Sequence, residues 1–138
     1  MLLNTRDFGE VVFEDNDIIT FVQPLYGFEE FKTFALMSED NTSGYLSWLQ
    51  SSTEPSLCFI LVNPESFKID YSFDLEDYYV GKLGNGEYTV WLVGVIRENF
   101  EESTVNLRSP IVINQDNKKA VQVMLDSEYP VRFPIYSN

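Results

Sequence analysis

The chain has no histidine, and only 9 of its 138 residues are lysine or arginine, against 22 aspartate and glutamate residues. Without histidine, the usual general base, the Ser-His and Cys-His nucleophile pairs and the commonest metal ligand are missing. The net charge of −13 argues against a nucleic-acid binder, because affinity for phosphate comes from lysine and arginine side chains that release counterions. The same charge argues against docking on an anionic membrane. We therefore expect no direct contact with nucleic acid or membrane, and most familiar enzyme classes are disfavoured.

Cysteine and long apolar runs are also scarce. The one cysteine, Cys58, cannot form an internal disulfide, and no cation lies near it in the sequence, so we expect a buried and unreactive thiol. No stretch approaches the roughly 20 apolar residues of a transmembrane helix. The N-terminus has no basic segment followed by a long apolar run, as a signal peptide would. These absences predict a cytoplasmic protein.

What the chain does contain is enough apolar material for a core. Hydrophobic residues make up 44% and aromatic residues 15%, a composition that argues against disorder. Short β-branched and aromatic runs recur about every ten residues, which favours an antiparallel sandwich or barrel. We predict an all-β fold in a single domain over residues 1–138, with both arrangements, the sandwich and the barrel, left open at this point. Strands are expected at residues 9–13, 18–22, 34–37, 44–50, 57–62, 87–96, 110–113, 120–125 and 131–133.

Helix is expected in one or two short segments only. Three phenylalanines within residues 28–34 have a spacing of three, which predicts a helical turn or two with the aromatic rings on one face. The acidic stretch 70–79 is interpreted differently, as a strand that leads into a short helix. Tight connections are expected at Gly84–Gly86, whose Asn-Gly pair suits a turn, and at the polar loop 114–119.

Carboxylates are the only plentiful catalytic groups. They cluster at residues 74–77 and 98–102, in polar sequence where solvation leaves both members of a pair ionised. The segment 15–17 begins like a calcium loop, but Thr20 and Tyr26 stand where such a loop needs glycine and glutamate. We predict no metal site, no cofactor and no enzyme activity.

The acidic charge itself has two interpretations. Residues 1–96 hold 16 acids and 4 bases, whereas residues 97–138 hold 6 acids and 5 bases. A surface of this kind is explained by solubility alone, or by attraction of a basic partner whose association it accelerates.

Several short segments follow one another in a characteristic order. The most specific is Asn106–Asn114, with the pattern Asn-Leu-x-x-Pro-Ile-x-Ile-Asn. Through this order the chain resembles the family of the flagellar assembly factor FliW, with one departure, Pro24-Leu25-Tyr26-Gly27 in place of Gly-Leu-Pro-Gly. The other matching segments are Phe8–Val11, Ile19–Phe21, Gly27-Phe28, Leu49–Ser51, Leu57–Phe59, Asn63-Pro64, Asp70-Tyr71, Val121–Leu125 and Tyr129–Ile135.

The resemblance implies a non-enzymatic regulator with a barrel-like β fold. Members of that family bind cytoplasmic flagellin as a chaperone-like partner and bind CsrA, an RNA-binding repressor of flagellin translation. When flagellin is secreted, the released factor binds CsrA and relieves the repression. Such partner switching requires that the two binding events disfavour each other. The acidic charge fits, because an RNA-binding partner is expected to carry basic patches.

Two groups of residues are candidates for partner binding. The group that contains Asn106 and Pro110 also has a structural explanation. Asn106 is suited to cap a turn, and Pro110 is suited to start an edge strand. For the group within the acidic stretch 70–77, the alternative to partner binding is a solvated loop with tyrosines packed underneath. Gln50, Ser51 and Gln122 are expected to satisfy backbone hydrogen bonds. The first group is Asp70, Tyr71, Asp74, Glu76 and Asp77, and the second is Asn106, Leu107 and Pro110.

Two other function classes remain as hypotheses. A carboxylate-dependent hydrolase needs two carboxyl groups of unlike environment that face one pocket. A small-ligand-binding barrel needs a closed apolar cavity of several hundred Å³.

Overall fold

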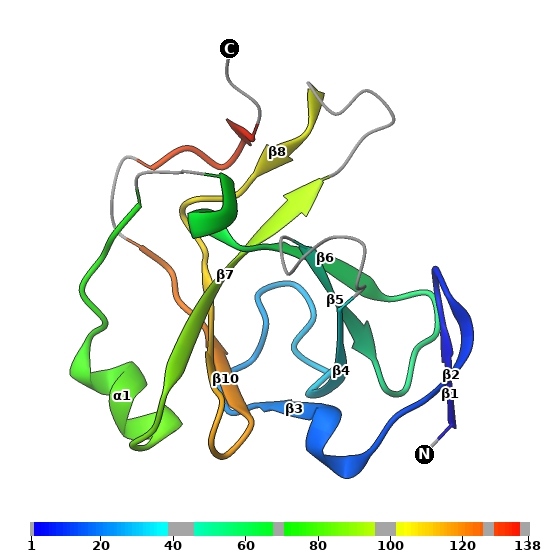
Figure 1. Ribbon diagram of the computed structural model, residues 1–138. Helices are drawn as coiled ribbons and strands as arrows, with labels where there is room; N and C mark the ends of the chain where they lie inside the picture. The colour runs from blue at the N-terminus through cyan, green and yellow to red at the C-terminus, as the bar shows by residue number, and fades with distance from the viewer. Residues whose placement is uncertain (1, 39–45, 68–70, 96–101, 126–128, 136–138) are drawn as a thin grey trace.

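The computed structural model describes residues 2–38, 46–67, 71–95, 102–125 and 129–135 (Figure 1). Strands make up most of it, and seven of them close into a barrel in the order β3-β4-β5-β6-β7-β9-β10, with β10 returning to β3. The predicted all-β barrel is therefore confirmed. The barrel strands are β3 (Ile18–Phe21), β4 (Thr33–Ser38), β5 (Leu46–Ser51), β6 (Cys58–Val62), β7 (Tyr88–Val95), β9 (Ile111–Asn114) and β10 (Lys119–Gln122).

Short elements surround the barrel. Within the described ranges, strands β1 and β2 pair only with each other, and β8 and β11 extend the sheet beyond the end of β7. Neither β1 nor β8 was expected as a strand, because each is short and lacks a long β-branched run. The bounds of these elements are β1 (Leu2–Thr5), β2 (Gly9–Val12), β8 (Thr104–Val105), β11 (Phe133–Pro134), α1 (Asp77–Leu83) and the 3₁₀ turns η1 (Asp15–Asp17) and η3 (Pro64–Phe67).

The pairing of the barrel strands is antiparallel with one exception. Strand β10 runs parallel to β3, with Lys119 opposite Thr20 and Ala120 opposite Phe21. This pairing closes the ring between an early and a late segment of the chain. The predicted antiparallel barrel therefore contains one parallel pair, at this seam.

The helix expected around residues 28–34 is also absent. Phe34 lies inside β4 and is fully buried, whereas Phe28 and Phe31 stand in two successive turns before that strand. The amide of Phe28 donates to the carbonyl of Leu25, and the amide of Phe31 donates to the carbonyl of Phe28. Each turn bond spans three residues, so the spacing that resembled a helix comes from turns.

The barrel interior is filled by packed side chains. Phe34 of β4 lies edge-on to Phe21 of β3, with ring centroids 5.4 Å apart. Burying such aromatic and aliphatic side chains contributes about 1.5–3 kcal/mol each. The buried members of this inner cluster are Ile19, Phe21, Leu25, Phe34, Leu49, Leu61, Ile111, Ile113 and Ala120.

Helix α1 covers the outer face of β9 and β10. Its Tyr79 and Leu83 are buried against Val112 and Val121. Gly84 ends the helix in the left-handed region, at φ 79°, where glycine has no steric penalty. The helix of the predicted acidic stretch is thus present, but residues 71–76 before it form no strand.

The loop after α1 is fixed by one fully buried amide. Asn114 at the end of β9 donates from Nδ2 to the carbonyls of Leu83 at 2.9 Å and Asn85 at 3.1 Å. Its Oδ1 accepts from the amide of Asp116 at 2.9 Å. The side chain therefore joins the predicted turn at 84–86 to the predicted β9–β10 loop.

The β1–β2 hairpin packs on the outside of β5 and β6. Phe8 in its turn meets Trp48 edge-on, with centroids 5.2 Å apart. The backbone amide of Arg6 donates to Oε1 of Gln50 at 2.9 Å, and its guanidinium donates to the carbonyl of Cys58 at 2.8 Å. The backbone and side chains of the turn between β1 and β2 thus hold the hairpin on the barrel.

Candidate functional site

A surface groove opens where the pairing of β6 and β7 stops. The two strands pair from Ile60–Gly94 to Val62–Leu92, after which β6 gives way to the turn η3. The first half of β7 continues alone on this side, while its other side pairs with β9. The groove therefore follows from a strand that is shorter than its neighbour.

The groove is mostly apolar and aromatic. Its volume of about 480 Å³ is in the range of pockets that accept one or two side chains or a small ligand. The segment 71–75 forms one wall and the first half of β7 the other. The lining residues are Asn63, Pro64, Glu65, Tyr71, Ser72, Phe73, Leu75, Tyr88, Thr89, Val90, Trp91 and Val112.

Tyr71, the predicted aromatic site residue, forms part of this wall. Its hydroxyl donates to the carbonyl of Leu107 at 2.6 Å, and its ring lies 5.0 Å from Tyr129 and 5.7 Å from Phe73. Burial, and the neighbouring Tyr129, raise the pKa of Tyr71 well above its ordinary value. The hydroxyl is therefore neutral and donates a structural hydrogen bond.

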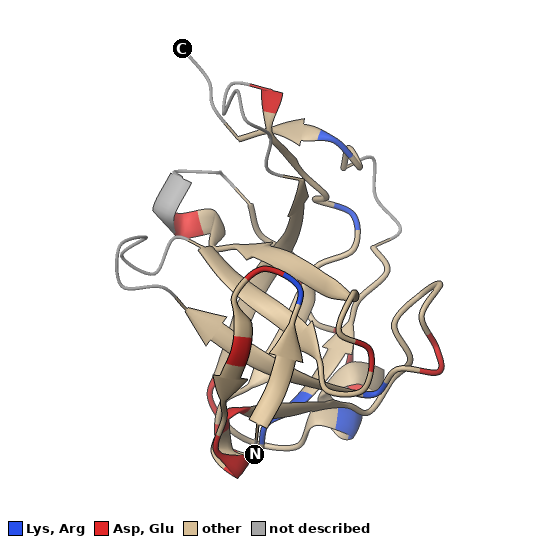
Figure 2. Cartoon of the chain, turned by 90° about the vertical axis from the view of Figure 1, so that its right-hand side faces the viewer, with Lys and Arg blue, Asp and Glu red and all other residues tan. Residues whose placement is uncertain are grey.

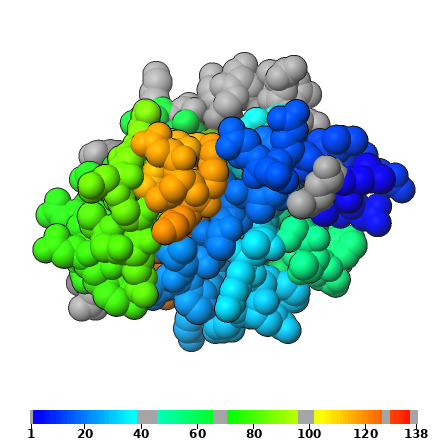
Figure 3. All heavy atoms as spheres, turned by 90° about the horizontal axis from the view of Figure 1, so that it is seen from below, coloured from blue at the N-terminus to red at the C-terminus, as the bar shows by residue number. Residues whose placement is uncertain are grey.

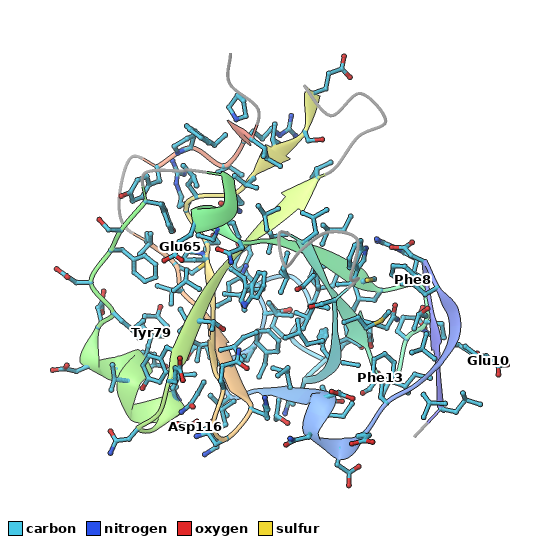
Figure 4. All side chains as sticks on the ribbon, in the orientation of Figure 1. Phe8, Glu10, Phe13, Glu65, Tyr79 and Asp116 are labelled. Atoms are coloured by element: carbon cyan, nitrogen blue, oxygen red, sulfur yellow. The ribbon has the colours of Figure 1, made fainter. Side chains whose placement is uncertain are left out.

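The predicted acids lie beside the groove. Asp74, Glu76 and Asp77 are all exposed, between the groove wall and the first turn of α1. Glu65 in the turn η3 lines the groove and is exposed, at the position labelled in Figure 4. Asp70 lies outside the described residues. We call Glu65, Asp74, Glu76 and Asp77 the acidic rim.

The second predicted group has structural roles. Oδ1 of Asn106 accepts from the amides of Arg108 at 2.9 Å and Ser109 at 3.2 Å, so Asn106 does cap a turn. Leu107 is buried in the cluster around β8, where its carbonyl receives Tyr71. The structure thus brings Tyr71 and Leu107 together.

Pro110 does not start an edge strand. It is buried and precedes β9, which pairs with β10 on one side and β7 on the other. Its carbonyl accepts from the amide of Val123, extending the β9–β10 ladder by one bond. Because the barrel closes at β9, a residue expected at an edge lies in the wall.

The glutamines and Ser51 satisfy backbone groups, as expected. The carbonyl oxygen of the Gln50 side chain accepts from Arg6, and its Nε2 donates to carbonyls of the following loop at 3.1–3.3 Å. Ser51 accepts from the amides of Thr53 and Glu54. Gln122 accepts from the amide of Tyr26 at 3.0 Å.

Of the residues that line the groove, only Tyr71 was predicted as a site residue, and Phe73, Trp91 and Glu65 are instructive among those that were missed. Phe73 was noted only within the acidic stretch, Trp91 only as a core residue, and Glu65 not at all. The available clue was Pro64, which ends β6 because proline cannot donate to a strand ladder. Long β7 beside short β6 indicates a gap in the wall, but only the strand register locates it.

In the part of the chain that the structure describes, the carboxyl groups do not form the pair that a hydrolase needs; Glu98 and Glu101 of the predicted cluster at 98–102 lie outside that part. Every described aspartate is exposed, and every described glutamate is exposed except the half-buried Glu54. Hydrogen bonding to Arg6 lowers the pKa of Asp7, and backbone N–H donors, its own first and then that of Gly27, lower the pKa of Glu29. Among the described residues, no three acids or cysteines come together as a metal site would require.

The groove also differs from the cavity of a ligand-binding barrel. Packed side chains fill the barrel interior, and the 480 Å³ hollow lies at the gap in its wall. The residues that face it belong to the segments 63–65 and 71–75, to β7 and, with Val112, to β9. The geometry is therefore that of a surface recess.

Cys58 is buried and forms no disulfide. Burial raises the pKa of its thiol to about 11, although the structure places Arg6 nearby and the cation acts in the opposite direction. Desolvation outweighs the cation, so the thiol stays protonated at neutral pH. The expected unreactive cysteine agrees with this environment.

The helices are short. The longest regular one, α1, has seven residues, and no helix in the described ranges has the length and hydropathy to cross a membrane.

Comparison with known proteins gives one consistent result. The family model described as "FliW protein" matches residues 2–135. Proteins named flagellar assembly factor FliW from Ruminiclostridium cellulolyticum and an Exiguobacterium species are 37% and 38% identical to this chain; the matches cover 96% and 98% of this chain and 92% and 94% of theirs. A solved structure, "Crystal structure of the flagellar assembly factor FliW", superposes with a TM-score of 0.90 at 29% identity and covers 100% of this chain and 99% of that one. The chain therefore belongs to the FliW family of flagellar assembly factors.

Proposed function

We propose that this chain is a cytoplasmic, non-enzymatic flagellar assembly factor that binds CsrA, relieves the repression of flagellin synthesis, and binds flagellin as a chaperone-like partner. Membership of the FliW family supports the flagellar role. The observation that carries the proposal is the acidic rim along an aromatic groove. A partner with a basic surface and protruding apolar side chains fits this combination.

The two parts of the site have different tasks. Exposed carboxylates attract a basic partner from a distance and orient it, which raises the association rate more than the final affinity. Aromatic and aliphatic walls exclude water around an inserted side chain, and such buried anchors carry most of the binding energy of an interface. We expect the rim to govern the rate of association and the groove to govern dissociation.

The non-enzymatic part of the proposal is supported by the carboxyl groups. A general acid needs a carboxyl group in an apolar pocket that raises its pKa. The acids of the rim are exposed, and Glu65 is the one carboxyl-bearing residue among those that line the groove.

The experiment that tests the proposal is a calorimetric titration with purified CsrA from the same source, repeated with flagellin present. We expect saturable binding of CsrA that flagellin weakens, because partner switching needs a negative coupling between the two events. Flagellin binding without CsrA binding would leave a chaperone without the regulatory arm. Binding of neither partner would contradict the proposal.

Charge reversal tests the rim itself. The triple variant Asp74→Lys, Glu76→Lys and Asp77→Lys should slow CsrA association about tenfold at low salt and flatten its salt dependence. A matched triple variant at the exposed residues Glu30, Glu87 and Glu102 makes the same change in net charge and should have a smaller effect. Thermal unfolding checks that both variants fold. Equal rates for the two triple variants would remove the rim as the interface.

A further inference from the structure

The β1–β2 hairpin carries sheet edges that no strand covers. Leu2 to Thr5 pair with Val12 to Gly9, and in the described part of the chain no third strand joins them. The outer edge of each strand therefore presents backbone N–H and C=O groups to the surface, where an added strand can pair with them. Figure 1 places this hairpin on the side of the barrel opposite α1.

The outward face of the hairpin is apolar at one end and polar at the other. Leu2 and Val12 lie directly opposite each other and are 61% and 74% exposed. Asn4 and Glu10 form the next outward pair, and Glu10 points away from the barrel in Figure 4. The inward positions are occupied, since Thr5 is buried and Phe8 packs on Trp48.

The surroundings of the hairpin are strongly acidic. Residues 2–17 hold five acids and one base, and all five acids are exposed. The one base, Arg6, forms an ion pair with Asp7 at 2.8 Å and donates to Cys58, so its charge is already compensated. Figure 2, which faces this side, shows the acids along the hairpin and the turn η1.

We infer that the β1–β2 hairpin is a docking edge for an extended basic segment of another protein, which adds a strand to it. Main-chain hydrogen bonds to β1 or β2 supply affinity, and alternate side chains of the added strand meet Leu2 and Val12. Its lysine or arginine side chains lie against Glu10 and the neighbouring acids. This site is separate from the groove, and it does not rest on the proposed partners.

The charges favour a foreign segment over a second copy of this chain. A second copy would bring its own acidic hairpin against Glu10, and like charges that face each other across paired strands are destabilising. Charged side chains on the edge of a sheet commonly prevent that edge from pairing with a second copy of the same protein. The acids of this hairpin do not repel a basic segment, and the apolar pair Leu2 and Val12 remains exposed for it to contact.

An NMR titration tests this inference with a defined probe. The probe is the end-blocked peptide Thr-Val-Thr-Val-Thr-Lys-Thr-Lys, whose alternate positions put two valines and two lysines on one face, and its control is the glutamate peptide Thr-Val-Thr-Val-Thr-Glu-Thr-Glu. We expect the lysine peptide to shift the backbone amides of residues 2–5 and 9–12. Glu10→Lys should weaken this binding about fivefold, and Val12→Thr should weaken it while keeping a β-branched side chain. Glu30→Lys, with the same change in net charge at another exposed site, should leave it within about twofold.

Three outcomes would overturn the inference. Equal binding of the glutamate peptide would show that charge does not select the occupant. Shifts confined to residues outside the hairpin would place the strand elsewhere. Concentration-dependent self-association that Val12→Thr abolishes would make a second copy the occupant.

Discussion

The groove and the hairpin carry the same charge on different architectures. Residues 63–77 and residues 2–17 each hold five acids and one base. The groove is built from side chains over a gap in the barrel wall, whereas the hairpin presents unpaired backbone. We therefore expect equal acidity to recruit different partners: the groove suits a protruding apolar side chain, and the hairpin suits an extended strand.

The two regions also differ in how they are attached. The groove wall is continuous with the barrel, because Tyr71 bonds to Leu107 and packs in the cluster around β8. The hairpin depends on a few contacts from its turn to β5 and β6, chiefly those of Gln50, Trp48 and Cys58. The groove and the hairpin lie at opposite ends of the molecule seen from below (Figure 3). A substitution in one region can therefore be expected to leave the other region unchanged.

Removing the Gln50 side chain should separate the two regions most strongly. Gln50→Ala deletes a fully buried amide that receives Arg6 and binds the carbonyls of the next loop. We expect a loss of about 2–4 kcal/mol in the free energy of unfolding, because several buried backbone groups lose their partner. Chemical denaturation measures the loss, and amide exchange should accelerate at residues 2–12 more than in α1. Uniform acceleration would show that the hairpin is not a separate unit.

The Cys58 thiol reports on the same attachment. With its pKa raised from 9.0 to about 11, the thiolate fraction at pH 8 is about a hundredfold below that of an ordinary cysteine. Alkylation by iodoacetamide should be slow below pH 11 and should accelerate in Gln50→Ala. Fast alkylation of the unaltered protein at pH 8 would contradict the burial of Cys58 beneath the hairpin contacts.

On the groove side, Tyr71→Phe removes one hydroxyl and keeps the ring. The carbonyl of Leu107 loses a donor, which should cost about 1–2 kcal/mol in the free energy of unfolding. Because the pKa of Tyr71 is raised in the folded state, the contribution of its hydroxyl is complete below the ordinary tyrosine pKa and is lost as pH rises through the folded value. The stability difference between the unaltered protein and the Tyr71→Phe variant should therefore shrink in strong alkali. A difference that does not depend on pH would assign the loss to packing.

The smallest effect is expected from the ion pair in the hairpin turn. Arg6 and Asp7 are 38% and 35% exposed, so solvent screens their attraction, and Asp7→Asn should change the free energy of unfolding by less than about 0.5 kcal/mol. Since Arg6 lowers the pKa of Asp7, the small contribution is present above the ordinary value of 3.8 and disappears as pH falls through the lowered one. Denaturation curves at pH 7 and pH 2.5 test this sign.

Local patterns predicted the strands and left a sandwich or a barrel open, and the resemblance to the FliW family implied the barrel. The runs that became β6 and β7 are apolar on both faces, and Pro64 marks where β6 ends. The parallel β3–β10 seam was not predictable, since it joins segments about 100 residues apart with no local pattern. The phenylalanine spacing at 28–34 misled because turns and helices share a three-residue repeat. The single domain over residues 1–138 stays a prediction.

The candidate site was predicted in part. The acidic and aromatic character of residues 71–77 was visible in the sequence, and whether they bind a partner stays a prediction. The groove beside them was not visible, because it depends on register: β6 ends opposite Leu92, and the side chains of Tyr88 and Val90 remain open. Asn106 and Pro110 stood out because they belong to the Asn106–Asn114 motif, and in the structure Asn106 caps a turn and Pro110 directly precedes β9.

The measurement that tests the central claim most directly is amide hydrogen exchange of the protein alone and in complex with CsrA. The claim is that the acid-rimmed groove binds this partner while the hairpin stays free for a strand. We predict that CsrA slows exchange at residues 71–80 and 88–91 and leaves residues 2–12 unchanged. Slower exchange at the hairpin with no change around the groove would contradict the claim and would assign CsrA to the docking edge.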